Sequence, residues 1–595
     1  MGNILVSENW YISIPATFVG LYWVLRILVL KPWGVHVQYA AAIERTKKKR
    51  EDGFIDFEKE TSYEAIRQNP RVNLSGDEHE LYAKLKDIVN YKLEVLREKL
   101  QKDELNATTV LIAYVWKAMS EHRRINCLTE VYTQAFILAE EADKKWSGSS
   151  EKPPFYGLPF SVKSNFNLKG YDVCVGVGKL LEQPKQEDCP FVTHLVNLGA
   201  IPFVITNVPQ GLMSFSCSNT VYGRTVNPHD LARTPGGSSG GEAALYVAGG
   251  SAFGIGSDLA GSLRIPASMC GCVSLKPTQD RFVVTNTHGG VPGRGRLGLS
   301  FGFFTSTVEE QISLLKEVIG TESYRLLVPQ SSPAELNINK IRDTKKLKIG
   351  YFDNDGFCPP VPSHARVVNE TVEKLKSAGH ECVRFYLPTP TEAAKLFYKN
   401  VMPDNGEYMR SLYDNEKIDD TMKQFVQLLK IPCCVRWLAS KILGPISPQL
   451  STICASYNSD IEDLRYTQEL TDQYKLTFIE YWKSLEIDAL ICPAFIVPAV
   501  GHKYPSKLAT AGFATGLFNM LDLPAGVVPT GKVTSEDDVE LFDEKKFPVG
   551  INLALKEQRD AAAKSEGLPA AVQIVTLPYE EEVCLKTMQL VENVW

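Results

Sequence analysis

A stretch rich in glycine and serine, residues 234–278, constrains the fold of this 595-residue chain more than any other segment. It reads TPGGSSGGEAALYVAGGSAFGIGSDLAGSLRIPASMCGCVSLKPT. Glycines surround Ser238, and Ser262 lies in a second turn of small residues. Glycine permits unusual backbone dihedrals and lets a ligand approach backbone N–H groups. The two turns indicate serine chemistry beside backbone donors, although a phosphate-binding loop or plain tight turns would look similar.

Composition limits the class of protein. A hydrophobic content of 44% over this length supports a large core, in two to four domains or in one large α/β domain with insertions. The net charge of −6 gives no general attraction to nucleic acid. The thirteen cysteines form no CxxC pair, which favours reduced thiols in a cytosolic compartment over a zinc site or a disulfide scaffold.

The N-terminal region predicts a membrane anchor. Residues 11–30 are apolar over the length that a helix needs to cross a bilayer, and residues 1–33 form the expected anchor. A cleaved signal peptide is less suitable, because no basic residue precedes the apolar run. The cluster RTKKKR at residues 45–50 follows the run and places the body of the protein in the cytosol. Residues 34–76 are expected to be a basic linker.

The remaining chain, residues 77–595, alternates helix and strand patterns. Residues 77–105 have apolar residues at helical spacing and predict one long helix, and residues 130–143 predict another. Strand, helix and strand are expected at residues 347–352, 363–378 and 382–386, with Ser363 as the helix N-cap. This alternation predicts an α/β sheet packed between helices.

Two further segments each allow two interpretations. Residues 425–443 interleave apolar side chains with Lys430, Arg436 and Lys441, which suits either a helix at a membrane surface or an ordinary helix pair over the core. Lys163 lies in the apolar strand GLPFSVK, where it is either an edge-strand lysine in solvent or a functional amine.

Several motifs together resemble the amidase signature family. They are GLPFSVK with Lys163, PGGSSGGEAAL with Ser238, GSDLAGSLRIPASMCGCVSLKPT with Ser262, and GLPAAVQIV near the C-terminus. Within that family, the anchor, TNVPQ and LDLPAGVVP are similar to the fatty acid amide hydrolases. The resemblance implies an α/β/α sandwich with a large mixed central sheet, preceded by one N-terminal transmembrane helix. It implies neither a metal nor a cofactor.

The resemblance also implies roles for three residues. Ser262 would be the nucleophile, Ser238 a bridging serine after a cis peptide bond, and Lys163 the base. A serine hydroxyl is a weak nucleophile until a base takes its proton, and lysine can act as a base only when it is neutral. Burial lowers the pKa of a lysine because it disfavours the ammonium form. The apolar strand around Lys163 is therefore a suitable place for it.

The backbone N–H groups of Leu259, Ala260, Gly261 and Ser262 would form the oxyanion hole. The family usually has glycine where Ala260 stands, and a methyl group there is tolerable only if φ is negative. Asp258 and Arg264 match positions that brace this loop.

The predicted activity is hydrolysis of long-chain fatty acid amides, such as N-acylethanolamines and primary amides, through an acyl-enzyme. The resemblance further implies an acyl channel lined by Leu212, Met213, Phe215, Met402, Val435 and Phe495, and residues 423–446 would be a helical insertion at the membrane surface. The expected partners are the fatty acid amide and the lipid bilayer, without nucleic acid, and a homodimer is left open. The catalytic domain is expected on the cytosolic face of the endoplasmic reticulum or another internal membrane.

Two other functions compete with this prediction. Residues 236–240 satisfy G-x-S-x-G, the nucleophile elbow of α/β-hydrolase esterases, with His288, His380 or His502 as the base. That motif needs a strand that ends at the serine, whereas LARTP precedes it here. A membrane-tethered protein that binds acylamides without hydrolysing them is the second alternative, and Ala260 is the residue that favours it.

Overall fold

The computed structural model describes residues 39–293 and 295–595. The expected anchor at residues 1–33 lies outside these residues. In the part of the chain that is described, no helix combines the length and the apolar composition that crossing a bilayer requires.

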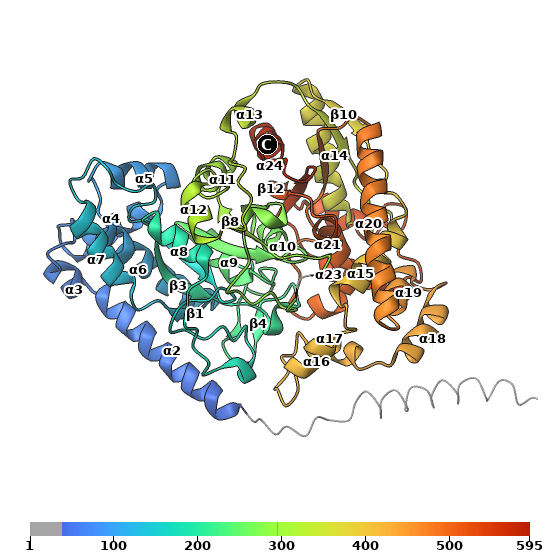
Figure 1. Ribbon diagram of the computed structural model, residues 1–595, viewed down its shortest axis with the longest axis horizontal. Coiled ribbons are helices and arrows are strands. Elements are labelled where there is room, and N and C mark those ends of the chain that lie inside the picture. Colours follow the sequence, from blue (N-terminus) through green and yellow to red (C-terminus); the bar gives the residue numbers. More distant parts are fainter. Residues whose placement is uncertain (1–38, 294) are drawn as a thin grey trace, which may run out of the picture.

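An 11-stranded mixed sheet forms the centre of the molecule (Figure 1). Its strands in chain order are β1 (Leu128–Val131), β2 (Pro159–Lys163), β3 (Ile201–Thr206), β6 (Phe253–Asp258), β7 (Val273–Lys276), β8 (Ser300–Thr305), β9 (Lys348–Tyr351), β10 (Glu381–Arg384), β11 (Ala489–Pro493), β12 (Ala525–Lys532) and β13 (Pro569–Val575). Their order in the sheet is β1-β3-β2-β6-β8-β7-β12-β13-β11-β9-β10. Strands β4 (Ser218–Asn219) and β5 (Gly223–Arg224) form a separate two-stranded sheet.

The helices connect and cover these strands. They are α2 (Ala40–Glu60), α3 (Tyr63–Gln68), α4 (Glu78–Val89), α5 (Leu93–Gln101), α6 (Ala107–Ile125), α7 (Ala135–Trp146), α8 (Pro190–Asn197), α9 (Gly240–Val247), α10 (Arg264–Cys270), α11 (Val308–Leu315), α12 (Glu322–Leu327), α13 (Ile338–Arg342), α14 (Pro362–Ser377), α15 (Pro390–Val401), α16 (Glu407–Leu412), α17 (Lys423–Leu429), α18 (Cys433–Leu443), α19 (Pro448–Ala455), α20 (Ile461–Ser484), α21 (Phe513–Met520), α22 (Ser535–Glu540), α23 (Leu553–Ala562) and α24 (Glu581–Val594).

Helices pack on both faces of the sheet. Along β13, Val572 joins the large core cluster that also contains Val367 of α14, whereas its neighbour Ala571 packs with Ala267 of α10. Successive residues of a strand point to opposite faces, so α14 and α10 cover opposite sides of β13. The mixed sheet between helices agrees with the α/β class expected from the sequence.

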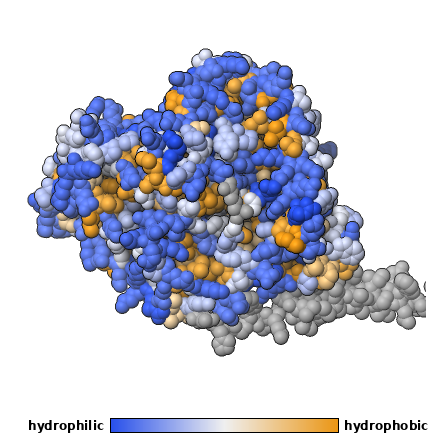
Figure 2. Space-filling model, in the orientation of Figure 1, coloured by the Kyte–Doolittle hydropathy of each residue, from blue (hydrophilic) through white to orange (hydrophobic). Residues whose placement is uncertain are grey.

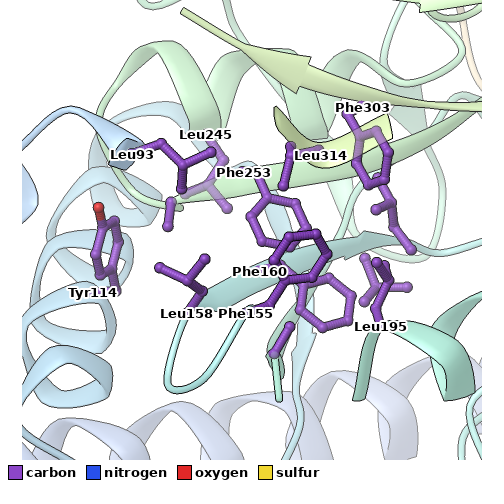
Figure 3. Packing of buried hydrophobic residues seen from close by; sticks show 14 of the residues in the cluster. Leu93, Tyr114, Phe155, Leu158, Phe160, Leu195, Leu245, Phe253, Phe303 and Leu314 are labelled. Atoms are coloured by element: carbon purple, nitrogen blue, oxygen red, sulfur yellow. The ribbon is translucent and has the colours of Figure 1, made fainter. Parts of the chain in front are cut away.

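The same alternation sets the direction of Lys163. Figure 3 shows Phe160 of β2 against Phe253 of β6 within the large cluster, where their rings stack with centroids 5.3 Å apart. Ser161 and Lys163 point to the other face, toward α9 and the residues before it. Because β2 is parallel to its neighbour β6, the carboxyl ends of both strands lie at the same edge of the sheet. This edge carries the residues described below.

Three local expectations were wrong. The helix expected over 77–105 is interrupted, because α4 ends at Val89 and α5 begins at Leu93, whose N–H donates to Glu310 Oε1. Val361, not Ser363, is the N-cap of α14, since Pro362 occupies the first helical position. Glu130 belongs to β1 rather than to the helix that follows it.

Residues 40–68 of the expected linker form helices. Figure 1 shows α2 as a straight helix along the edge of the molecule, ahead of α3. Its side chains Ile43, Phe54 and Phe57 are buried. The described part of the segment therefore packs against the body of the protein.

Candidate active site

Three residues from distant parts of the sequence meet in one line of hydrogen bonds. Lys163 is the last residue of β2, Ser238 lies just before Ser239, the N-cap of α9, and Ser262 lies in the loop between β6 and α10. Lys163 Nζ lies 2.9 Å from Ser238 Oγ, and Ser238 Oγ lies 2.9 Å from Ser262 Oγ. A proton can pass between neighbours at such distances.

Lys163 is a buried amine in the interior of the sheet. Strand β2 lies between β3 and β6, so the alternative of an edge lysine in solvent is wrong. Burial lowers the pKa of Lys163 to about 7, although the negative charges of Asp258 and Glu242 act in the opposite direction. A lysine with this pKa is substantially neutral near physiological pH and can accept a proton.

Ser257 of β6 holds the Lys163 amine in place. Lys163 Nζ donates to Ser257 Oγ at 3.0 Å and to Ser257 O at 3.3 Å. Asn165 Nδ2 also donates to Ser257 Oγ, at 3.0 Å. Sequence patterns did not predict roles for Ser257 and Asn165, because their contacts arise from the register of β2 against β6.

Glu242 of α9 is a third residue of the site that sequence patterns did not predict. Its two carboxyl oxygens accept hydrogen bonds of 2.6 Å from Ser161 Oγ and Thr206 Oγ1. Burial raises the pKa of Glu242 to about 8, against the effects of these hydroxyls and of Lys163. Because Ser161 and Lys163 point to the same face of β2, Glu242 lies on the face of the sheet that carries Lys163.

The turn before Ser238 needs glycine. The peptide bond between Gly237 and Ser238 is cis, as expected. A Cβ atom at Gly237 would lie 2.2 Å from Ser216 O, so any larger residue would displace the backbone of residues 214–216. Ser238 therefore depends on a close approach of two backbone segments.

The loop that carries Ser262 leaves several backbone donors available. Gly261 has a φ of 125° and donates its N–H to Asp258 Oδ1 at 2.6 Å. Among the described residues, none accepts a hydrogen bond from the N–H of Leu259, Ala260 or Ser262. Ala260 does not adopt a positive φ, so its methyl group is compatible with the loop.

A buried ion pair fixes this loop. Arg264 donates to both carboxyl oxygens of Asp258 at 3.0 Å, and neither side chain is exposed. Burial alone would raise the pKa of Asp258, but Arg264 and Asn519 outweigh it and hold the pKa well below its usual range. Arg264 also donates to Thr515 O and to Gln573 Oε1. These contacts tie the loop to α21 and β13.

A largely apolar cavity of about 370 Å³ opens over Ser238 and Ser262. Five of the six residues expected in an acyl channel line it: Leu212, Met213, Phe215, Met402 and Val435. The expectation for Phe495 was wrong, because this side chain is buried behind Phe215, with ring centroids 5.4 Å apart. The walls that the sequence analysis missed include Phe397, Val401, Phe425 and Leu429.

Helices α17 and α18 contribute part of the cavity lining, and both also carry exposed apolar side chains. Leu428, Trp437, Leu438 and Ile442 are between 43% and 53% exposed. Figure 2 shows hydrophobic residues along the lower edge of the molecule, on the side where Figure 1 places these helices. Helix α18 thus carries cavity residues on one side and apolar surface on the other, whereas Leu428 of α17 is both exposed and part of the cavity lining.

The histidines proposed for a nucleophile elbow bind other groups. His288 Nε2 lies 3.2 Å from Tyr408 OH, His380 Nδ1 accepts the N–H of Leu347, and His502 Nε2 lies 3.3 Å from Leu231 O. Strand β5, which precedes Ser238, ends at Arg224. The strand-turn-helix context of an elbow does not occur at Ser238.

Comparison with known proteins gives one consistent result. Residues 109–585 match the protein family described as "Amidase". The chain is 34% identical over 501 residues to "Fatty acid amide hydrolase 1" of Caenorhabditis elegans, which covers 84% of this chain and 87% of that protein. It is 33% identical over 504 residues to "Fatty-acid amide hydrolase 1" of Sus scrofa, covering 84% and 85% respectively.

The fold is likewise similar to a solved structure. The structure described as "Fatty acid amide hydrolase" superposes with a TM-score of 0.74 at 22% identity, and the match covers 95% of this chain and 96% of that one.

Proposed function

The chain belongs to the amidase family and is an amidohydrolase, and on that premise we propose that it hydrolyses long-chain fatty acid amides with Ser262 as the nucleophile. The observation that carries this proposal is the line of hydrogen bonds from Lys163 through Ser238 to Ser262 at the base of an apolar cavity. The relatives named as fatty acid amide hydrolases support the substrate class.

In the first half of the reaction, Ser262 Oγ attacks the amide carbonyl and gives its proton to Ser238 Oγ. Ser238 passes its own proton to the neutral amine of Lys163. The resulting ammonium retains Ser257 O and Ser257 Oγ as acceptors, so it is formed where hydrogen-bond partners already exist. The developing oxyanion would be stabilised by the N–H groups of Leu259, Ala260 and Ser262. Gly261, expected in the same set, has its N–H directed to Asp258.

The second half reverses the proton path. Collapse of the tetrahedral intermediate breaks the C–N bond, and the leaving amine takes the proton that Lys163 returns through Ser238. Water then attacks the acyl-Ser262 ester and gives a proton to Ser238 Oγ, while Ser238 passes its own proton to Lys163. When the bond to Ser262 Oγ breaks, the proton returns through Ser238 to Ser262, and the fatty acid is released.

The lining of the cavity favours a long acyl chain over a short one. Each methylene that leaves water for an apolar wall contributes about 0.8 kcal/mol. Phe425, Leu429 and Val435 would contact the distal part of the chain. The exposed apolar surface of α17 and α18 suits contact of residues 423–446 with a lipid surface, from which such a substrate would enter. The anchor, the cytosolic placement on an internal membrane and a homodimer stay predictions from the sequence.

A fluorophosphonate probe combined with hydrolysis assays tests the mechanism. The purified protein and its Ser262→Ala, Lys163→Ala and His288→Ala variants are labelled and then assayed against acylamides of different chain length. We expect labelling and hydrolysis to disappear in Ser262→Ala, to fall strongly in Lys163→Ala and to persist in His288→Ala. Labelling that survives Ser262→Ala but disappears in His288→Ala would instead favour the esterase. A folded wild-type protein that neither labels nor hydrolyses would favour the binding protein.

A further inference from the structure

We propose that Cys433 and Cys434, at the start of α18, are a pair of S-acylation sites that attach this helix to a lipid surface beside the mouth of the cavity. The proposal rests on the proposed function in one respect, because it assumes that residues 423–446 face a membrane. The sites are distinct from the reaction at Ser262.

The exposure of these two thiols sets them apart from the other cysteines. All thirteen cysteines lie among the described residues, and none is in a disulfide. Nine are buried, Cys382 and Cys454 are partly buried, and Cys433 and Cys434 are exposed. An acyl-transfer enzyme can reach a thiol only where it is accessible, so the fold restricts modification to this pair.

The helix geometry aligns both thiols with the apolar outer surface of α18. Residues four apart lie on the same face of a helix, so Cys433 is followed by Trp437, and Cys434 by Leu438 and Ile442. These three apolar side chains are 53%, 45% and 43% exposed. A chain attached to either thiol therefore emerges beside side chains that are themselves suited to a lipid surface.

The opposite side of α18 faces the cavity. Val435 and Ala439, also four residues apart, line it, and so does Arg436, which lies at the edge between this side and Cys433. Acylation on the outer side leaves the walls of the cavity in place. Lys441 lies 5.8 Å from the centre of the Trp437 ring and adds a positive charge that is favourable near anionic lipid headgroups.

Two adjacent sites fit the physical requirement for stable attachment. One acyl chain binds a membrane only marginally and reversibly, whereas two chains, or one chain with a second signal, hold a protein stably. Cys433 and Cys434 supply two chains at one place, next to an apolar helix face. Cysteines on amphipathic helices near a membrane are typical acceptors of reversible S-acylation.

The reaction is a thioester exchange. The sulfur of Cys433 or Cys434 attacks the carbonyl carbon of a long-chain acyl-coenzyme A, the co-reactant, which a protein acyltransferase would present. A new carbon–sulfur bond forms to the cysteine, the bond to the coenzyme A sulfur breaks, and the cysteine proton leaves with the coenzyme A thiol. No oxidation or reduction occurs.

Acyl-polyethylene-glycol exchange on the full-length protein expressed in eukaryotic cells tests the proposal. Free thiols are reduced and blocked, hydroxylamine cleaves thioesters, and a maleimide polymer adds a fixed mass to each thiol that is released. We expect up to two hydroxylamine-dependent mass steps in the wild type and at most one in Cys433→Ser or Cys434→Ser. The double variant should show none, and Cys382→Ser, the matched control, should show the wild-type pattern.

Two results would overturn the proposal. One is a double variant that keeps its mass steps. The other is a wild-type protein that shows no mass step in a lysate where a reporter protein known to be S-acylated does shift. A disulfide between Cys433 and Cys434 would give this same result. Fluorophosphonate labelling of the same samples shows that each variant is folded. It also distinguishes a failure of the proposed S-acylation from a failure of the proposed hydrolysis. Mass steps without labelling of Ser262 would refute the proposed hydrolysis and leave the acylation intact.

Discussion

Lys163 is a side chain that normally carries a positive charge, held where a charge is unfavourable. Burial brings its pKa to about 7, and Ser257 supplies two acceptors, its backbone oxygen and its hydroxyl, for the amine. The third neighbour is Ser238 Oγ, the group from which a proton would come. A neutral amine at this position needs no movement to begin the reaction and none to hold the proton.

The pH dependence of hydrolysis should report this pKa. Because the base must be neutral, kcat/KM should fall about tenfold per pH unit below pH 7 and level off above it. Lys163→Ala should lower kcat by roughly 10²–10⁴-fold and remove this limb of the profile. Initial rates between pH 5 and 9 with a soluble acylamide provide the measurement. A wild-type profile that is flat from pH 5 to 9 would exclude Lys163 as the base.

Two neighbouring positions in the nucleophile loop should respond in opposite ways. Gly261→Ala places a Cβ atom 2.2 Å from Thr515 Oγ1 at a φ of 125°, and a displaced nucleophile loses about 10²-fold in rate. Ala260→Gly, the matched control, changes a residue without a positive φ and should keep kcat within a few-fold. Fluorophosphonate labelling rates check both. Similar losses in the two variants would show that backbone strain is not the cause.

At the scale of elements, the loop between β6 and α10 is held by contacts to parts of the chain far away in sequence. Arg264 reaches α21 and β13 as well as Asp258. Several elements that are fixed independently therefore determine the conformation of the loop. The same contacts hold Ser262 in position.

Breaking the buried ion pair should destabilise the whole protein. Arg264→Leu leaves Asp258 charged and unpaired, which costs about 3–5 kcal/mol of the free energy of unfolding. Arg296→Ala removes an ion pair with Asp472 in which both side chains are about half exposed, and it should change stability by less than about 1 kcal/mol. Urea unfolding followed by fluorescence measures both. Equal stability of the two variants would contradict this role of Arg264.

The side of α18 that faces the cavity should set the preferred length of the acyl chain. Val435→Trp fills space where the distal methylenes would lie, so kcat/KM for long acylamides should fall about tenfold or more while short ones change little. Competition between acylamides of two lengths in one reaction measures the ratio. A uniform loss for both lengths would show that Val435 does not contact the acyl chain.

The outer side of α18 should matter only when the substrate is in a bilayer. Replacing Trp437, Leu438 and Ile442 by serine removes exposed apolar area without touching the cavity. We expect a several-fold loss of hydrolysis with substrate in vesicles and little change in detergent micelles. An equal loss of hydrolysis in vesicles and in micelles would indicate that these side chains contribute to folding rather than to membrane contact.

At the scale of the whole molecule, sequence patterns predicted what is local. The β9-α14-β10 unit and the strand ending at Lys163 were recoverable because apolar periodicity is a property of short windows. The grouping of Lys163, Ser238 and Ser262 came from motifs that occur together. Both the apolar periodicity and the motifs can be recognised in the sequence itself, without knowledge of contacts between distant residues.

What depends on distant contacts was not predictable. At the break between α4 and α5, Glu310 accepts a hydrogen bond from the N–H of Leu93, which lies 217 residues away in the sequence. The anchoring of Lys163 by Ser257 requires the register of β2 on β6. Phe495 was expected in the channel from the family resemblance, but whether such an apolar residue lines a cavity or supports its wall depends on side-chain direction.

The walls of the cavity have a consequence for how such a protein can diverge. The groups that would break the amide bond lie between residues 163 and 264, whereas most of the walls come from residues 397–512. The residues that would carry out the reaction and the residues that would select the substrate are thus encoded by largely separate parts of the gene. Mutations in the second part can retune which amide is accepted while the first stays unaltered. A chimera that exchanges residues 397–512 with those of a relative should carry over the donor's substrate preference together with the recipient's pH dependence.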